Sequence, residues 1–131
     1  MKKKVLLIHT GGTIGMVRDQ DLGVLKPDSL HESIHQMIPQ LSDIADIIVE
    51  IPFLCDSSDL GISHWQQIAS LIGEAVNKVN GVVVTHGTDT MAYTASALSY
   101  MLSNLPIPVI LTGAQKPLGE LRSDARANLI N

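Results

Sequence analysis

Two threonines stand in glycine-rich segments directly after apolar runs, where their hydroxyls could act on a polar bond. Thr13 lies in His-Thr-Gly-Gly-Thr-Ile-Gly at residues 9–15, and Thr88 lies in Thr-His-Gly-Thr-Asp-Thr at residues 85–90. A threonine hydroxyl becomes a nucleophile when a neighbouring base or hydrogen bond activates it. Asp89 could hold a cationic group of a ligand, and Thr88 could relay a proton or orient a water molecule. These residue types suit nucleophilic chemistry on a small polar ligand.

Each of these residues also has a simpler structural role, which spacing alone favours for Thr13. A threonine in a tight turn can bond its own backbone, Asp89 can cap the helix that follows it, and His86 can be a buried structural residue at a strand end. The glycines at 11, 12 and 15 lack the Gly-Lys-Ser/Thr of a phosphate-binding loop and the spacing of the dinucleotide fingerprint. A nucleotide-binding domain is therefore disfavoured.

Two more polar loops follow the remaining apolar runs. Asp-Ser-Ser-Asp occupies residues 56–59, and Thr-Gly-Ala-Gln occupies residues 112–115. Hydroxyls and backbone N–H groups in such loops suit a ligand carboxylate. Each loop alone is a weak signal, but together with the two threonine loops they give four polar, small-residue segments.

Four apolar runs predict the strands that carry these loops, at residues 4–9, 47–54, 81–85 and 108–112. All but the second are continuous rather than alternating, which is typical of parallel strands covered on both faces. Pro52 puts the end of the second run at an edge or a bend. Helical spacing predicts helices at residues 28–37, 63–79, 90–103 and 120–131. This alternation predicts an α/β fold: a doubly wound, mostly parallel sheet with helices on both faces.

The sheet edge and the helix ends add two expectations. The carboxyl ends of parallel strands share one edge, where open α/β folds bind ligands, so the four polar loops should meet in one crevice. Asp28 or Ser29 caps the first helix and Pro39 ends it. The last helix is still in progress at Asn131, without a glycine or proline stop, and we expect the chain to be part of a longer protein.

Composition excludes several classes of protein. With 131 residues, 45% of them hydrophobic, the chain can form one domain with a real core. The formal net charge of −4 argues against a nucleic-acid partner. Lys2, Lys3 and Lys4 form a basic terminus, but the apolar run behind them is too short for a signal peptide. No run approaches the roughly 20 apolar residues of a membrane span.

Cysteine and histidine usage bears on compartment and metal binding. Cys55 is the single cysteine, which excludes an intrachain disulfide and fits a reducing cytoplasm. A catalytic thiol is the alternative to a small buried apolar residue, and the buried role is favoured. His31 and His35 are four residues apart but lack a third ligand nearby, so no metal site is predicted.

The paired motifs at residues 10–16 and 86–91 resemble those of the bacterial-type L-asparaginase family. Residues 56–59, 91–98 and 121–124 strengthen the resemblance, which spans essentially the whole chain and is strongest to the cytoplasmic, type I branch. It implies hydrolysis of L-asparagine, and in some members L-glutamine, to the acid and ammonia. It implies no cofactor, and a homo-oligomer (dimer or tetramer) for the full-length protein. It also reverses the assignment of Thr13, whose position is that of the family's nucleophile.

The resemblance implies further roles by position. Thr88 matches the family's second threonine, which pairs with a lysine to activate water and helps to form the oxyanion hole. Asp89 matches the acid that holds the substrate's α-ammonium group. Ser57 would hold the α-carboxylate, and the backbone of Ala114 would contact the side-chain amide. The substrate-binding residues implied in this way are Asp56, Ser57, Ser58, Thr88, Asp89 and Ala114.

Three departures from the family's pattern qualify that assignment. The family places a tyrosine in the mobile segment after its first motif, and residues 16–27 contain none. The lysine that pairs with Thr88 would lie beyond residue 131, because Lys116 falls in the wrong motif. Third, family members are much longer and have a second, smaller C-terminal domain, so we expect residues 1–131 to be one N-terminal asparaginase-like domain, truncated before that second domain. The alternative functions are a non-catalytic amino-acid-binding or assembly fragment and, within the amidohydrolases, the amidotransferase subunit that supplies ammonia to mischarged transfer RNA.

Overall fold

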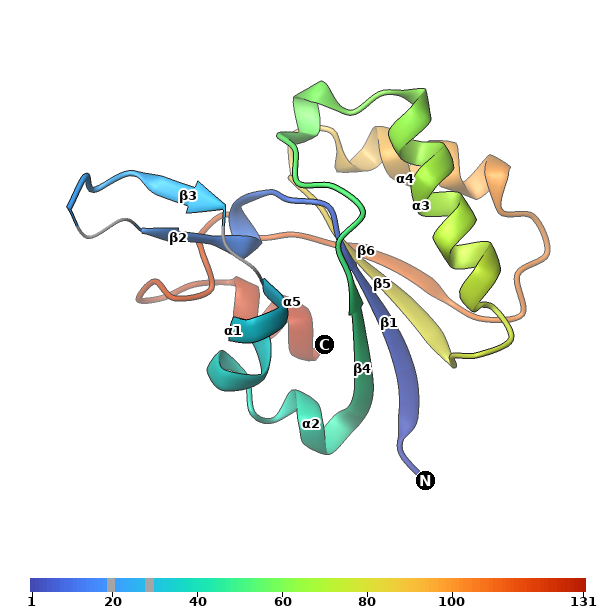
Figure 1. Ribbon diagram of the computed structural model, residues 1–131, viewed down its shortest axis with the longest axis horizontal. Coiled ribbons are helices and arrows are strands. Elements are labelled where there is room, and N and C mark those ends of the chain that lie inside the picture. Colours follow the sequence, from blue (N-terminus) through green and yellow to red (C-terminus); the bar gives the residue numbers. More distant parts are fainter. Residues whose placement is uncertain (19–20, 28–29) are drawn as a thin grey trace.

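Four parallel strands form the central sheet of the computed structural model, which describes residues 1–18, 21–27 and 30–131. The order across the sheet is β4-β1-β5-β6, so the first strand lies inside and two of its successors flank it (Figure 1). All three pairings are parallel, which confirms the predicted fold class. The strands are β1 (Lys3–His9), β4 (Ala45–Glu50), β5 (Gly81–Thr85) and β6 (Val109–Thr112).

Both faces of this sheet are apolar, as the continuous runs predict. Leu7 is in register with Val49 and Val83, and Leu6 is in register with Val82. In-register partners in a parallel sheet point to the same face, and successive residues point to opposite faces. Each face therefore carries its own row of aliphatic side chains and needs its own layer of helices.

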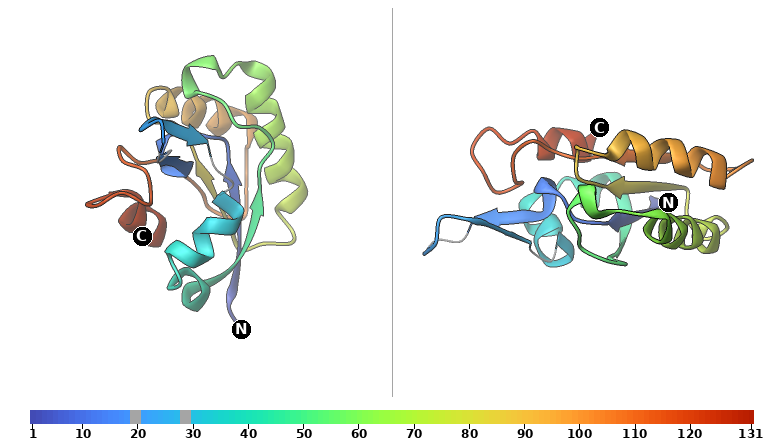
Figure 2. Two further views of the ribbon diagram at one scale, coloured as in Figure 1. Left: turned by 60° about the vertical axis from the view of Figure 1, so that its left-hand side comes forward. Right: turned by 90° about the horizontal axis from the view of Figure 1, so that it is seen from above.

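The helices divide between the two faces (Figure 2, left). On one face, α3 (Ile62–Ala75) and α4 (Met91–Met101) pack on a core that includes Ile8, Ile72 and Val84. On the other face, a second core centred on Leu7 is packed by residues of the remaining helices, which are α1 (Leu30–Met37), α2 (Leu41–Ile44) and α5 (Ala125–Ile130). None of the helices in the described ranges is long and apolar enough to cross a membrane.

Several element boundaries differ from the predicted ones. The second strand covers residues 45–50 rather than 47–54, so it ends before Pro52, which has no N–H to donate to a neighbour. The last helix begins at Ala125 rather than near residue 120, because Arg122 adopts a φ of 60° that a right-handed helix does not allow. Helix α3 ends at Ala75, and residues 76–78 form a turn. The cap residues Asp28 and Ser29 lie outside the described residues.

A small hairpin follows the first motif and is absent from the sequence-based prediction. It consists of β2 (Met16–Arg18) and β3 (Leu25–Pro27), which pair antiparallel and project away from the main sheet (Figure 1). Arg18 ties the hairpin down: its Nε donates to Glu120 Oε1 at 3.0 Å, and its Nη1 donates to the Gly23 carbonyl at 2.8 Å. The hairpin is therefore anchored to the loop that follows β6.

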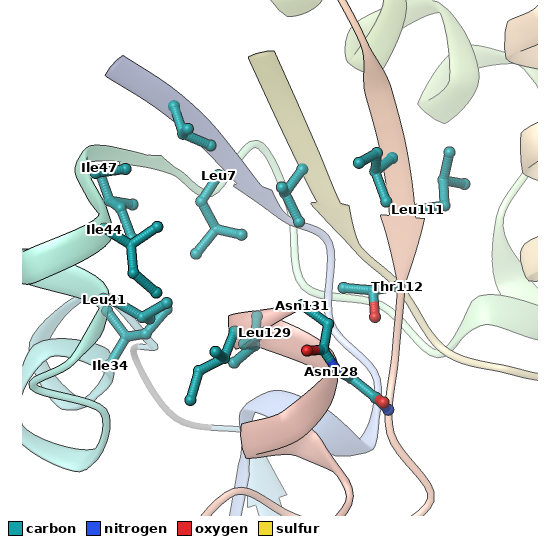
Figure 3. A pocket seen from close by; sticks show the side chains of 15 residues that line it. Leu7, Ile34, Leu41, Ile44, Ile47, Leu111, Thr112, Asn128, Leu129 and Asn131 are labelled. Carbon is teal, nitrogen blue, oxygen red and sulfur yellow. The ribbon is translucent and has the colours of Figure 1, made fainter. Parts of the chain in front are cut away.

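An apolar hollow of about 220 Å³ lies between the sheet and the helices α1, α2 and α5. Figure 3 shows Leu7, Ile44, Ile47 and Leu129 around it. Its lining is almost wholly aliphatic, and none of the glycine-rich loop residues after β1 and β5 belongs to it. The hollow is a gap in the packing of one sheet face, and the polar chemistry lies elsewhere.

We expect the α3–α4 face to supply much of the stability. Ile72 is fully buried, whereas Ile62 at the start of the same helix is 65% exposed. Ile72→Ala should lower the free energy of unfolding by about 2–5 kcal/mol, because it removes buried methyl groups and leaves a cavity. Ile62→Ala is the matched control and should change it by less than about 0.5 kcal/mol. Urea denaturation followed by circular dichroism measures both, and equal midpoints would contradict this account.

Candidate active site

The strand order puts the switch point of the sheet between β1 and β5. From β1 the chain crosses to β4 on one side, and from β5 it crosses to β6 on the other side. Connections that leave neighbouring strands in opposite directions mark the position, called the crevice, at which α/β sheets bind ligands. The two threonine loops follow β1 and β5, so the structure brings both predicted motifs side by side to this edge of the sheet.

Backbone hydrogen bonds join the bases of all four polar loops. The Cys55 N–H donates to the Thr10 carbonyl, and the Thr10 N–H donates to the Thr85 carbonyl, both at 3.1 Å. The His86 N–H donates to the Thr112 carbonyl at 2.9 Å. The ladder of the sheet thus continues past the strand ends, and the loops leave from one rigid edge.

The first two loops touch backbone to backbone. A Cβ at Gly12 would lie 2.6 Å from the Gly87 Cα, and a Cβ at Gly11 would lie 2.5 Å from the Cys55 carbonyl oxygen. Both glycines also have positive φ angles, 116° for Gly11 and 82° for Gly12, which other residues rarely adopt. Gly12 therefore lets the loop after β5 pack against the first loop, and Gly11 does the same for the loop after β4, so close packing explains the paired glycines without any phosphate.

Thr13 begins a short 3-10 turn, η1 (Thr13–Gly15), and is half-buried. The turn is closed by the Gly15 N–H, which donates to the Gly12 carbonyl at 3.2 Å. Within the described part of the chain, the Thr13 hydroxyl makes no hydrogen bond. The turn-bonding role considered for the Thr13 hydroxyl is therefore not seen among the described residues.

A buried histidine supports the first loop from beneath. His9 is 1% exposed, and its Nδ1 lies 2.7 Å from Thr85 Oγ1. Its Nε2 lies against Gly15, where any Cβ would overlap the ring. Burial lowers the pKa of His9 to about 4, so the imidazole is neutral at pH 7. His9 is not among the site residues predicted from the sequence.

Ser57 and its neighbours form the third loop, which begins with the 3-10 turn η2 (Ser57–Asp59). The Asp56 carboxylate accepts a hydrogen bond from the Ser58 N–H at 2.9 Å and another from the Ser58 hydroxyl, and these bonds lower the pKa of Asp56. Ser57 is buried, and its carbonyl accepts a 2.7 Å bond from Thr90 Oγ1. Asp56 and Ser58 are thus partly occupied in shaping the turn, while Ser57 is fixed to the β5 loop.

The β5 loop presents one hydroxyl and one free carboxylate. Thr88 is half-buried and its Oγ1 accepts a 3.1 Å hydrogen bond from Gln115 Nε2. Asp89 is exposed, and it makes no ion pair or hydrogen bond with any residue that the structure describes. Thr90, not Asp89, occupies the N-cap of α4, so the capping role considered for Asp89 is wrong. An unpaired carboxylate at the crevice suits a cationic ligand group.

The fourth loop is held by a side chain from the turn before α5. The Asp124 carboxylate accepts hydrogen bonds from the backbone N–H of Gln115 at 3.0 Å and of Lys116 at 3.1 Å. These bonds lower the pKa of Asp124, with that from Gln115 the largest cause. The loop places Ala114 at 3% exposure. Sequence reasoning noted residues 121–124 only as part of a resemblance and assigned Asp124 no role.

The described residues contain no group of three or more His, Cys, Asp or Glu side chains arranged to hold a metal ion. The crevice offers instead two hydroxyls, a carboxylate and backbone N–H groups. The fold and this crevice together define the class of protein: a doubly wound α/β domain whose threonine-bearing loops meet at the switch point of the sheet.

Comparison with known proteins identifies the family within that class. Residues 4–131 match the family model described as asparaginase, N-terminal. The chain belongs to the asparaginase family, whose members are amidohydrolases. It is 46% identical to L-asparaginase 1 of Escherichia coli K12 over 99% of its own length and 39% of that protein. It is 42% identical to a glutamyl-tRNA(Gln) amidotransferase component of Pyrococcus abyssi, over 97% of this chain and 29% of that protein.

Solved structures agree with this assignment. L-asparaginase I from Vibrio cholerae superposes with a TM-score of 0.87 at 42% identity, over all of this chain and 40% of that one. The thermostable L-asparaginase from Thermococcus kodakarensis gives 0.86 at 40% identity, over 96% of this chain and 38% of that one. The chain therefore spans about two fifths of the length of these relatives.

Because His9 and His86 are buried and neutral, we expect the free energy of unfolding to fall in mild acid. Between pH 6.5, the ordinary pKa of histidine, and about 4, the folded-state pKa of His9, the unfolded chain binds a proton that the folded chain does not. The free energy of unfolding then rises with pH across this window, and the stabilisation is lost as the pH falls through it. Burial lowers the pKa of His86 too, so both residues contribute.

His9→Asn tests the share that comes from His9. Urea denaturation at several pH values across the window should show a weaker dependence of the unfolding free energy on pH for this variant than for the wild type. Equal slopes in the two proteins would mean that His9 is not the buried, neutral group described above.

Proposed function

We propose that this domain carries the nucleophile and most of the substrate cradle of an enzyme that hydrolyses L-asparagine to L-aspartate and ammonia. The observation that carries the proposal is the contact between the Gly12 and Gly87 backbones, which brings the Thr13 loop against the loop of Thr88 and Asp89, while the Thr13 hydroxyl and the Asp89 carboxylate have no partner among the described residues. The 46% identity to an L-asparaginase 1 supports asparagine as the substrate. The reaction needs no metal and no cofactor.

The proposed chemistry proceeds in two steps. The Thr13 oxygen attacks the side-chain amide carbon and gives up its hydroxyl proton, which ends on the amide nitrogen; the C–N bond then breaks, so that ammonia leaves and an acyl ester remains on Thr13. A water molecule attacks the ester carbon, and the Thr13 oxygen departs with a proton as aspartate forms. A backbone N–H that stabilises the oxyanion lowers the barrier by about 3 kcal/mol. Holding both α-groups of the substrate makes the attack effectively unimolecular.

The remaining loops divide the substrate between them in this proposal. Asp89 binds the α-ammonium group, and the Ser57 loop, which includes Asp56 and Ser58, binds the α-carboxylate. The backbone of Ala114 contacts the side-chain amide. Gln115 donates to one lone pair of the Thr88 oxygen at 3.1 Å, so the hydroxyl proton of Thr88 is directed away from Gln115. That proton is then free to bond a water or the reacting oxygen.

The organisation of the full-length protein is also part of the proposal. Residues 1–131 form a single N-terminal domain, and a smaller C-terminal domain completes the protein in a cytoplasmic homo-oligomer. The length of the relatives supports this, because the chain covers 39% of L-asparaginase 1. A small amino acid is the ligand, rather than a nucleic acid or a membrane.

A non-catalytic amino-acid-binding or assembly fragment is the second candidate. One observation favours it: no tyrosine occurs at residues 16–27 to activate Thr13. Calorimetry with L-aspartate and an ammonia-release assay separate the candidates. Binding by residues 1–131 without ammonia release favours the fragment, and ammonia release favours the enzyme.

Thr13→Ala tests the nucleophile. The variant should be made in residues 1–131 joined to the remaining sequence of Escherichia coli L-asparaginase 1, so that the second domain is present. We expect kcat for L-asparagine to fall by roughly a thousandfold or more, as for other nucleophile substitutions. Thr13→Ser keeps a hydroxyl and should retain measurable turnover, whereas undiminished ammonia release by Thr13→Ala would overturn the assignment.

Asp89→Asn tests the proposed grip on the α-ammonium group. The change keeps the size of the side chain but removes its charge, and a hydrogen bond to a charged group contributes about 1.5–3 kcal/mol. KM for L-asparagine should therefore rise roughly 10–100-fold, by the same free-energy difference. Asp59→Asn, at another exposed acid beside the crevice, is the control. Identical KM and kcat in the wild type and Asp89→Asn would remove Asp89 from the site.

A further inference from the structure

A network of hydrogen-bonded side chains, half-buried at Trp65 and buried at Thr94 and His86, runs from α3 to the loop that carries Thr88, and the proposed chemistry does not use it. Trp65 Nε1 donates to Thr94 Oγ1 at 3.0 Å. His86 Nε2 lies 2.8 Å from the same Thr94 oxygen, and His86 Nδ1 lies 2.6 Å from the Gly87 carbonyl oxygen. Thr94 and His86 are both fully buried. Three elements, α3, α4 and the end of β5, are thus joined by three hydrogen bonds.

The position of each polar hydrogen in this network follows from which groups can donate and which can only accept. The Gly87 carbonyl can only accept, so His86 Nδ1 must carry a proton. Burial lowers the pKa of His86, which keeps the imidazole neutral, so Nε2 is an acceptor. The Thr94 hydroxyl then donates to Nε2, and its oxygen accepts from the Trp65 indole, which can only donate. Each group is satisfied in one arrangement only.

This hydrogen-bonded network ends at Gly87, which packs against both the Ser57 loop and the Gly12 loop. A Cβ at Gly87 would lie 2.7 Å from Ser57 Oγ, and Gly12 packs on Gly87 from the other side. The Gly87 carbonyl belongs to the peptide unit whose N–H is that of Thr88. Rotation of this peptide would displace Thr88 and would break the contacts that hold the Ser57 and Gly12 loops.

We propose that His86 is a positioning residue, which Thr94 and Trp65 hold in one tautomer so that it fixes the Gly87–Thr88 peptide and thereby the orientation of Thr88 and Asp89. The fixing of the peptide follows from the hydrogen bonds themselves. Its consequence for substrate binding rests on the proposed function. A histidine that only filled the core would not need a defined tautomer.

The test compares Thr94→Val, which removes the hydroxyl at nearly constant volume, with Thr94→Ser, which keeps it. Nitrogen-15 NMR of the imidazole should show a protonated Nδ1 and an unprotonated Nε2 in the wild type and in Thr94→Ser. Amide order parameters of Gly87, Thr88 and Asp89 should be near the rigid value of about 0.85 in both proteins. In Thr94→Val they should fall below about 0.6, while the amide of Leu98 on the same helix stays rigid.

Trp65→Phe provides a second variant in case Thr94→Val does not fold, because it removes the indole N–H together with the five-membered ring but keeps a six-membered aromatic ring. It should lower the order parameters at Thr88 and Asp89 in the same direction and by less. A protonated Nε2 in the wild type would overturn the proposal. So would order parameters at Thr88 and Asp89 that are unchanged in folded Thr94→Val or Trp65→Phe.

The ammonia-release assay separates this proposal from the proposed function. In the joined protein described above, Thr94→Val should raise KM for L-asparagine at least fivefold, with a smaller change in kcat, and Thr94→Ser should restore it. If no variant and no wild type releases ammonia while the loop responds as described, the proposed function fails and the positioning role stands. If ammonia release is normal in Thr94→Val, the positioning role fails and the proposed function stands.

Discussion

The contact between Gly12 and Gly87 is the constraint on which the rest of the crevice depends. A Cβ at Gly12 would lie 2.6 Å from the Gly87 Cα, so the two loops meet with no side chain between them. The strand order brings the loops to the same edge, but the absence of side chains at these two positions determines how closely they approach. Thr13 directly follows Gly12, and Thr88 directly follows Gly87. The contact between these two glycines therefore brings the two threonine loops to the same place.

Each of the two loops rests on a buried, neutral histidine. His9 lies beneath the first and is paired with the Thr85 hydroxyl, and His86 lies behind the second and is paired with the Thr94 hydroxyl. An aliphatic residue could fill the same volume, but it could not hold a hydroxyl or a backbone carbonyl in a fixed direction. Burial lowers the pKa of both rings and keeps them uncharged, so no charged group has to be buried behind the loops.

The sheet and the loops that follow it could be predicted from sequence because their signals are local. Continuous apolar runs mark strands covered on both faces, and the polar residues after them must lie at the carboxyl edge. The hairpin of β2 and β3 could not be predicted, because strands of three residues carry too little pattern. The start of α5 depends on the positive φ of Arg122 and on hydrogen bonds that the Asp124 carboxylate accepts from the backbone of a loop eight and nine residues earlier.

The same distinction applies to the candidate site. The positions of Thr13, Thr88 and Asp89 follow from glycine-flanked motifs that can be read within a few residues, whereas the bond from Gln115 to Thr88 spans 27 residues of sequence, so no local pattern indicates it.

The histidines also constrain where proton transfer can take place. His9 turns one ring nitrogen to Thr85 and the other against Gly15, and both nitrogens of His86 are used within the core. His86 cannot accept the proton of Thr13 without giving up the bonds that hold its loop, and a proton on His9 would put a charge on a ring whose pKa burial lowers to about 4. A general base must lie within hydrogen-bond reach of the group that it deprotonates. In this fold the two histidines hold the loops in place. The base that deprotonates Thr13 has to be another residue, one that reaches the open side of the crevice.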